Sequence, residues 1–174
     1  QTRDGQLCDI VIDRAALEAI ERAGRESDSE LIAKYAELTV AAADIKTAVR
    51  CQKTGKSLEF IRRALAPCRS LDVYQLARAA ADSLEAVSDY LSTTDYAAAV
   101  SALEQSPSAF ERWCDNVIIE SIRPQQFQAF GIGPLAAYIL GRENEIKCVR
   151  IILSGKLNDL PEASIRERIR EMYV

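Results

Sequence analysis

Apolar residues recur at steps of three and four along almost the whole chain, which is the spacing of one face of an α-helix. The alternation that is typical of a half-buried strand never lasts more than a few positions. We therefore predict an all-α protein of antiparallel helical hairpins with about nine helices. The longest pattern follows the Ser27–Ser29 cluster and ends at Gly55, and its predicted inward stripe is Leu31, Tyr35, Leu38, Ala42, Ile45, Val49 and Gln52.

Capping residues, glycines and prolines predict where the other helices begin and end. The first helix is expected to follow Asp13 as N-cap and to stop at Gly24. Further helices are predicted to begin at Ser57, Ser70, Asp82 or Ser83, Asp95, Ser106 and Pro134, and the last to run from Pro161 to about Met172. In the helix from Pro134 to Gly155, the residues expected to point into the core are Leu135, Ile139, Ile146, Val149 and Leu153.

The stretch Gly55-Lys56-Ser57 matches the end of the phosphate-binding loop of nucleotide hydrolases. The first glycine of that motif would stand at position 50, which is Arg50, and no strand-like run precedes it. The structural alternative is that Gly55 ends one helix in a left-handed conformation, Lys56 lies near the exposed carbonyls, and Ser57 caps the next helix. We favour a helix–turn–helix here, and a nucleotide-binding enzyme remains an alternative.

A second glycine–lysine pair stands one hundred positions later in the chain. "VRCQKTGK" at 49–56 and "VRIILSGK" at 149–156 share Val-Arg, four residues, and Gly-Lys. We therefore predict a partial internal duplication, in which Gly155 and Lys156 form a second turn after a second long helix.

Composition and charge restrict the classes of function that the chain could have. The net charge is −4, which disfavours nucleic acid as a partner. The chain has no histidine, which removes Ser-His-Asp and Cys-His catalysis, and its five cysteines form no CxxC pair. We expect reduced thiols in a cytosolic protein, no metal and no cofactor. The longest uncharged stretch, 124–141, contains prolines and glycines and does not predict a membrane-spanning helix.

Three basic residues are candidates for contact with a partner protein. Arg142, Lys147 and Arg150 lie on the same predicted helix. We favour an ordinary solvated helix surface for these residues, and contact with a partner is the alternative. By pattern alone, the chain is a soluble all-α interaction or scaffold module.

The sequence at residues 134–174 resembles the C-terminal signature of the C subunit of V-type ATP synthases, the homologue of the d subunit of the eukaryotic V-ATPase. In that family a proline–leucine start, a "KENEI(K/R)NLRIIL" helix, a "GKLNGLP" turn and an "IRERLRE-Y" ending occur in this order. The residues that match are Glu143–Lys147, Arg150–Leu153, Gly155–Asn158, Leu160, Pro161, Ile165–Arg168, Tyr173 and Val174.

Two upstream stretches carry the same resemblance. "DIVIDRAALEAI" is similar to the family's "DIVLDRAYF" helix start, with Ala16 in place of the usual aromatic residue. "DIKTAVRCQKTGKS" resembles the family's "NIKTALRAKRLGKS" helix end, including Gly55 and Lys56. The resemblance covers most of 9–69 and 130–174, whereas 70–129 matches only in helical pattern.

The resemblance implies a funnel-like fold of repeated helical subdomains and a non-catalytic role in the central stalk of a V-type ATPase. Its implied partners are the rotor shaft subunits and the membrane rotor ring, and its implied place is the cytoplasmic face of the membrane, reached through protein contacts only. The adaptor would transmit torque that couples ATP hydrolysis or synthesis to proton or sodium transport. A stand-alone helical scaffold for soluble partners is the alternative.

The resemblance and the helix pattern together suggest a division of the chain into three parts. They are a helical subdomain at 1–69, a middle helical segment at 70–129, and a C-terminal hairpin at 130–174. Because family members are about twice as long as this chain, and because it begins with Gln1, we expect it to be the C-terminal half of a longer protein.

Overall fold

A computed structural model describes residues 5–174, which hold nine α-helices, a 3₁₀ turn and no strand. The prediction of an all-α fold is confirmed. The chain divides into two compact units, of which the first ends at Val100 and the second is Ser101–Val174. The division into three parts drawn from the sequence stays a prediction.

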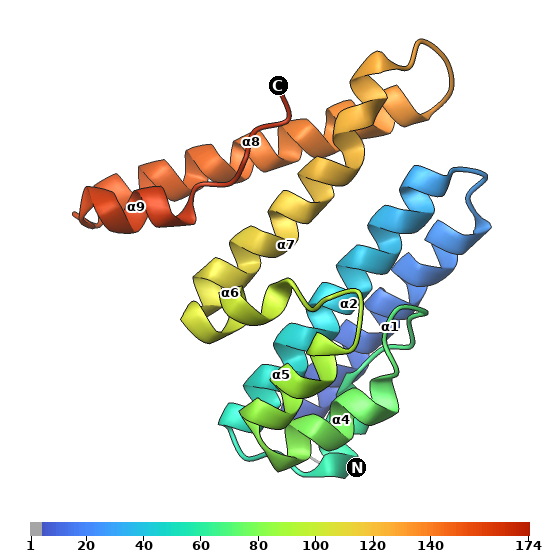
Figure 1. The fold of residues 1–174 in the computed structure, drawn as a ribbon, viewed down its shortest axis with the longest axis vertical. Helices are drawn as coiled ribbons and strands as arrows, with labels where there is room; N and C mark the ends of the chain where they lie inside the picture. The colour runs from blue at the N-terminus through green and yellow to red at the C-terminus, as the bar shows by residue number, and fades with distance from the viewer. Residues whose placement is uncertain (1–4) are drawn as a thin grey trace. The chain divides into compact units, whose positions relative to one another are not determined.

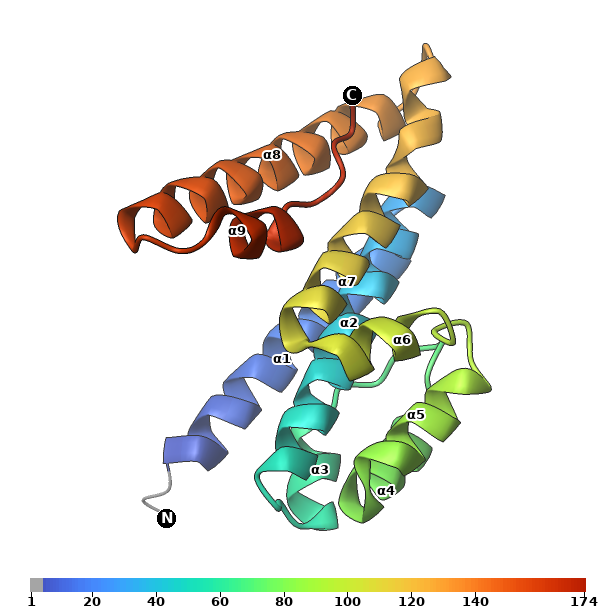
Figure 2. The same cartoon turned by 60° about the vertical axis from the view of Figure 1, so that its left-hand side comes forward.

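The first unit is built around α2. Its helices are α1 (Gly5–Glu26), α2 (Glu30–Lys53), α3 (Leu58–Ala64), α4 (Val73–Asp82) and α5 (Leu84–Ser92). The helices α1 and α2 lie side by side as an antiparallel hairpin (Figures 1 and 2), and α3, α4 and α5 also pack on α2. The predicted stripe of α2 is only partly its inner face: Leu31, Ile45 and Val49 are buried as expected, whereas Tyr35, Leu38, Ala42 and Gln52 are half-buried. Because α2 has neighbours on several sides, it also buries Ala36, Val40, Ala41 and Ala48 outside that stripe.

Serine side chains cap several helices of this unit as the sequence predicts. The hydroxyls of Ser29, Ser57 and Ser83 accept hydrogen bonds from backbone N–H groups in the first turns of α2, α3 and α5. Ser70 is not a cap, because its hydroxyl bonds to Glu37 and Tyr96, and Asp72 caps α4 instead.

The boundaries predicted for the first helix are wrong at both ends. Asp13 lies inside α1, which is already helical at Gly5, because Leu7 and Ile10 extend the half-buried face toward the N-terminus. Gly24 does not end the helix either. A Cβ atom there would lie 2.3 Å from the Cβ of Ala36, so this glycine permits the close approach of α1 and α2.

One carboxylate is buried in the core of the first unit. Asp44 on α2 is fully inaccessible, and its Oδ1 accepts a hydrogen bond of 2.9 Å from the backbone N–H of Ala66. Its Oδ2 has no hydrogen-bond partner among the described residues. Burial raises the pKa of Asp44 to about 7, against the opposing effects of the Ala66 hydrogen bond and the charge of Arg14.

The second unit is a helical hairpin with a C-terminal segment packed along it. It contains α7 (Pro107–Ile122), a 3₁₀ turn (Arg123–Phe127), α8 (Gly133–Leu157) and α9 (Glu162–Arg168), while α6 (Ala99–Gln105) spans the division between the units. Ser106 caps α7 as predicted, but α6 begins at Ala99 and not after Asp95. After α9 the chain turns back along α8 (Figure 1). This last part, 169–174, is not helical, so the helix predicted to reach Met172 ends early.

The turn predicted at Gly155 and Lys156 lies four residues further on. Gly155 is a buried residue inside α8, and Asn158 caps that helix. The turn itself forms at Asp159, whose φ of 52° is left-handed, and the N–H of Leu160 donates to the carbonyl of Gly155 at 2.9 Å. A Cβ atom at Gly155 would lie 2.6 Å from Ile165. Glycine stands at 155 because α9 packs against the helix there.

The core stripe predicted for α8 is wrong. Leu135, Ile139, Ile146, Val149 and Leu153 are 48–56 % exposed, and the buried residues are Ala137, Gly141, Asn144, Cys148 and Gly155 on the opposite face. The buried face is made of small side chains because the C-terminal segment approaches it closely. The pattern of large apolar residues therefore identified the helix but assigned its inner face incorrectly.

Candidate partner-binding site

The stretch Gly55-Lys56-Ser57 is a helix end, a turn and a helix start. Gly55 has a left-handed φ of 62°, and its N–H donates to the carbonyl of Gln52 at 3.1 Å. The N–H of Lys56 donates to the carbonyl of Cys51 at 3.0 Å, which completes a Schellman motif. The structural interpretation of these residues therefore agrees with the backbone geometry.

The Lys56 side chain is also engaged within the first unit. Its ammonium donates to Oε1 of Gln6 at 2.6 Å and lies 5.1 Å from the centre of the Phe60 ring. A cleft of about 430 Å³ next to it is lined partly by the carboxylates Asp9 and Asp13. Arg50 and Lys56 line the same cleft, so its charge is mixed and not the concentrated positive charge that a nucleotide's phosphates favour.

The C-terminal segment, residues 169–174, is held in the second unit by small residues on α8. A Cβ atom at Gly141 would lie 2.9 Å from the Tyr173 ring, so glycine allows this ring to reach the helix backbone. The Cys148 thiol is 3.9 Å from the carbonyl of Arg170. Ile165 of α9 packs on Gly155 in the same way. The chain from Ile165 to Tyr173 therefore runs antiparallel to α8 along most of that helix.

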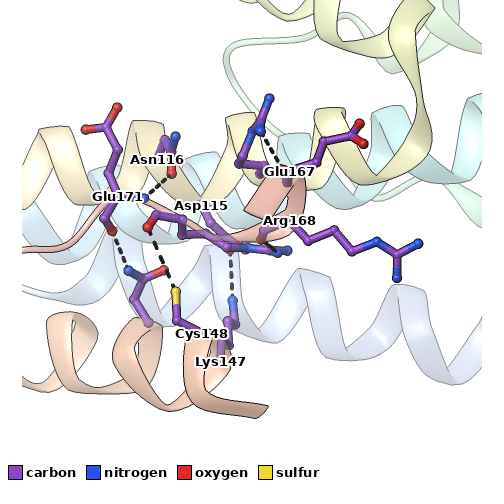
Figure 3. A network of polar contacts seen from close by, with 10 residues as sticks. Asp115, Asn116, Lys147, Cys148, Glu167, Arg168 and Glu171 are labelled. Carbon is purple, nitrogen blue, oxygen red and sulfur yellow. Dashed lines mark hydrogen bonds and ion pairs between the residues drawn. The ribbon is translucent and has the colours of Figure 1, made fainter. Parts of the chain in front are cut away.

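A polar network joins the same segment to both α7 and α8 (Figure 3). The carboxylate of Asp115 on α7 accepts from Lys147 on α8 and from Arg170 of the segment, each at 2.8 Å. The Asn116 side chain accepts from the backbone N–H of Glu171 at 2.9 Å, and the carbonyl of Glu171 accepts from Nδ2 of Asn144 at 2.7 Å. Three separate parts of the unit thus meet at Asp115 and Glu171.

The electrostatics of Asp115 indicate a stabilising contact. Burial would raise the pKa of this carboxyl group, but the hydrogen bonds and charges of Lys147 and Arg170 outweigh it and hold the pKa below its usual value. The side chain of Arg170 is only 9 % exposed, whereas that of Lys147 is 56 % exposed. Arg170 is therefore the more strongly desolvated partner, and removing the Asp115 carboxylate would leave its charge buried without this partner.

The structure does not bring Arg142, Lys147 and Arg150 together in one row. Arg142 pairs with Glu145 on the same helix, and Lys147 is turned toward Asp115 on α7. Arg150 is exposed and forms no ion pair within residues 5–174. Contact of these three residues with a partner stays a prediction.

The large apolar side chains of α8 form an exposed seam opposite its buried face. We define the α8 seam as residues 135, 139, 142, 146, 149, 153 and 156, which follow one another at alternating steps of four and three. Five of the seven are apolar and exposed, and the other two are Arg142 and Lys156. An exposed apolar strip of this kind, interrupted by Arg142, is a candidate site of protein–protein contact.

Sequence reasoning missed the residues that anchor the C-terminal segment. Asp115 and Asn116 are adjacent polar residues on α7, whereas Asn144 and Arg170 lie in charged stretches. The apolar period gave no signal for them, because it places Asn144 on the face of α8 opposite the predicted stripe and Asp115 away from the apolar stripe of α7. None of these positions has a spacing that points to chemistry.

The described residues also allow two negative observations. Within 5–174, no group of three or more cysteine, aspartate or glutamate side chains is placed to hold a metal ion. In the same range, every helix is too short or too polar to cross a lipid bilayer.

Comparison with known proteins places the chain in one family. The sequence model of the ATP synthase (C/AC39) subunit family matches residues 1–168. The chain is 25 % identical to the C subunit of the V-type sodium ATPase of Enterococcus hirae over 97 % of its length and 52 % of that protein. It is 26 % identical to the C subunit of the A-type ATP synthase of Thermococcus kodakarensis, over 87 % of the chain and 42 % of the relative.

The chain thus spans about half the length of the curated relatives that it matches. No solved structure matches it significantly. The match to the family model nevertheless extends through both units of the fold and ends at the last residue of α9. The chain belongs to the ATP synthase (C/AC39) subunit family, whose curated members named here are C subunits of V-type and A-type complexes.

Proposed function

We propose that the chain is a non-catalytic adaptor in the central stalk of a V-type or A-type ATPase. In this role it links the rotor shaft to the membrane rotor ring and transmits the torque that couples ATP hydrolysis or synthesis to proton or sodium transport. It would lie on the cytoplasmic face of the membrane and reach the membrane only through other subunits. The observation that carries the proposal is the family match over residues 1–168.

The geometry of the second unit supports this proposal. An element that transmits torque must resist deformation, and the C-terminal segment is fixed to α7 and α8 by Asp115, Asn116 and Asn144. Several residues of the family signature are those that build this unit: Asn144 and Lys147 bond across it, and Gly155 and Tyr173 make its close contacts. The signature therefore has a mechanical explanation that needs no catalytic group.

Co-elution of the purified chain with separately purified shaft and ring proteins of the same organism's ATPase tests the proposal. We expect the chain to form a stable complex with each of them in size-exclusion chromatography. Failure to bind either of them would count against the adaptor role and in favour of a scaffold for unrelated soluble partners.

The same assay tests the candidate contact residues. Replacing all three of Arg142, Lys147 and Arg150 by alanine should weaken binding to shaft or ring by roughly tenfold, since each exposed charge contributes up to about 1 kcal/mol. The matched control replaces three exposed basic residues of the first unit, Lys34, Lys53 and Arg78. An equal loss in both variants would show a general charge effect and would remove the three residues as specific contacts.

A further inference from the structure

The spacing of the α8 seam is that of a coiled coil. In heptad terms, one core position holds Ile139, Ile146 and Leu153, and the other holds Leu135, Arg142, Val149 and Lys156. An amphipathic helix that packs on a broad protein core has a wider apolar face, whereas a strict seam of steps four and three suits one other helix lying lengthwise. The geometry of α8 therefore calls for a single long helix as the covering element.

We propose that the α8 seam of the chain on its own is covered by the α8 seam of a second copy, packed antiparallel about a two-fold axis. The proposal goes beyond the adaptor role and does not depend on it. Because Arg142 and Arg150 would lie in this interface, a second copy on the seam and a shaft or ring subunit at these two residues exclude each other. A two-fold interface brings the same surface of both copies together, so the seam must complement itself. Whether the seam complements itself depends on the charged residues beside it and within it.

The charges beside the seam select one register. Glu143 and Arg150 occupy the same flanking heptad position, seven residues apart, and both are exposed. When Ile146 packs against Val149 of the second copy, Glu143 lies next to the second copy's Arg150. The two-fold axis repeats this contact, so two opposite-charge pairs form. Sliding the helices by one heptad places Glu143 against Glu143 in one direction and Arg150 against Arg150 in the other, which brings like charges together.

The two cations within the seam select the antiparallel orientation. A parallel pair in register would place Arg142 against Arg142 and Lys156 against Lys156 in the core of the coiled coil. In the antiparallel register, Arg142 lies across from Leu153, and Lys156 lies across from Ile139. Their aliphatic stems then cover apolar side chains while the charged ends reach solvent, and Arg142 keeps its ion pair with Glu145.

Analytical ultracentrifugation of the 174-residue chain over a series of micromolar concentrations tests the proposal. We expect a species of twice the 19.2 kDa of one chain. Val149→Asp should abolish it, because a carboxylate would enter the central layer, while folding persists because Val149 is 53 % exposed within one copy. Circular dichroism and thermal unfolding check that this variant is folded. A chain that stays monomeric at every concentration would overturn the proposal.

Charge exchange tests the register itself. Glu143→Arg and Arg150→Glu should each weaken the dimer by roughly tenfold, since each turns two attractive pairs into two repulsive ones. The double variant Glu143→Arg/Arg150→Glu should restore it, because the pairs are exchanged and not lost. Glu120→Arg, an exposed change on α7, is the matched control and should have no effect. A dimer indifferent to the single changes, or a double variant no better than either single one, would overturn the antiparallel seam.

Discussion

Asp159 has the left-handed backbone conformation at the turn that ends α8, and Gly55 has it at the turn that ends α2. An L-residue with a side chain pays a steric cost in this conformation that glycine avoids. The "GKLNGLP" turn of the family that the chain resembles has glycine at this point. The chain therefore carries a small strain at the turn that ends α8.

Replacing Asp159 by glycine should stabilise the protein by about 1 kcal/mol, because the left-handed conformation then costs nothing. Chemical denaturation of the variant and the parent measures the difference in the free energy of unfolding. Asn158→Gly is the matched control. Its φ of −102° needs no glycine, so the added backbone freedom should destabilise the protein. Stabilisation by both changes, or by neither, would contradict this explanation of the turn.

Asp44 should make the stability of the protein depend on pH in an unusual direction. Its pKa is raised to about 7, so the folded state binds a proton that the unfolded state releases near the ordinary value of 3.8. Between pH 5 and pH 8, the free energy of unfolding should therefore be greatest at pH 5 and should fall by roughly 2–3 kcal/mol as the pH rises to 8. The chain has no histidine, so the usual titrating group of this window is missing.

Asp44→Asn is the test of this dependence. The amide keeps an oxygen for the N–H of Ala66 but carries no charge at any pH. Its unfolding free energy should therefore be nearly constant from pH 5 to pH 8, and higher than that of the parent at pH 8. The same decline with pH in the variant would mean that another group is responsible.

At the residue scale, the sequence predicted those features that depend on neighbouring residues alone. Ser29, Ser57, Ser83 and Ser106 cap helices because a hydroxyl before a helical run meets N–H groups three residues later. Gly24 was misassigned because its close contact with Ala36 of α2 decides its role, and Asp13 was misassigned because α1 already begins at Gly5. Rules for helix ends that use only neighbouring residues therefore fail where a contact with another helix decides the role of the residue.

At the scale of elements, α8 shows why its inner face could not be read from apolar periodicity. The helix carries two faces, one of large apolar residues and one of small ones, and the small face is buried because the C-terminal segment and α9 come close to its backbone. The spacing of large apolar residues identifies the most apolar face of a helix and does not detect a face that is buried because it carries glycine and alanine. The exposed seam was therefore predicted to be the inner face.

Gly155→Ala should destabilise the protein by about 1–3 kcal/mol although alanine is the better helix former, because the new methyl group would lie 2.6 Å from Ile165. Thermal and chemical unfolding measure this effect. Ser154→Ala, at the exposed neighbouring position, should change little. Ile165→Ala combined with Gly155→Ala should cost less than the sum of the two single changes, since both act on one contact. Strict additivity would contradict the close approach of α9 to α8.

Asp115→Ala should release the C-terminal segment, because Arg170 is almost inaccessible and would lose its carboxylate partner. We expect a loss of roughly 2–3 kcal/mol in stability and faster amide hydrogen exchange at 169–174. Glu162→Ala, which removes a fully exposed pair with Arg166, is the control and should cause no measurable change. Unchanged exchange in the segment would show that apolar contacts alone hold it.

The pKa of Asp115 gives this contact a direction of pH dependence. Because the folded-state pKa lies below the unfolded value of 3.8, the stabilisation is present above that value and is lost as the pH falls through the folded pKa. Asp115→Ala should therefore unfold with less dependence on pH in the acid range. Asp44 and Asp115 thus act in opposite directions and in separate pH windows.

At the scale of the whole molecule, the sequence predicted the fold class and the family because both rest on long patterns. Helical periodicity over most of the chain predicted an all-α protein, and the ordered matches at 134–174 pointed to the family that the comparison confirms. The polar contacts at Asp115 could not be predicted, because they join residues 55 positions apart in the sequence.

The glycine–lysine pair should not bind nucleotide. Gly55, Lys56 and Ser57 each have a structural role, and the adjacent cleft carries carboxylates. Isothermal titration of the chain with Mg-ATP should therefore give no binding heat. Tight binding that is lost in Lys56→Ala would revive the nucleotide-binding alternative.

In the proposed adaptor role, the chain couples the soluble and membrane parts of a rotary ATPase. The most direct measurement is ATP-driven ion transport by the complex in liposomes, assembled from purified subunits with and without the chain. Omission should abolish transport while ATP hydrolysis by the soluble part continues, and adding the chain back should restore transport. Transport that proceeds equally well without the chain would contradict the adaptor role.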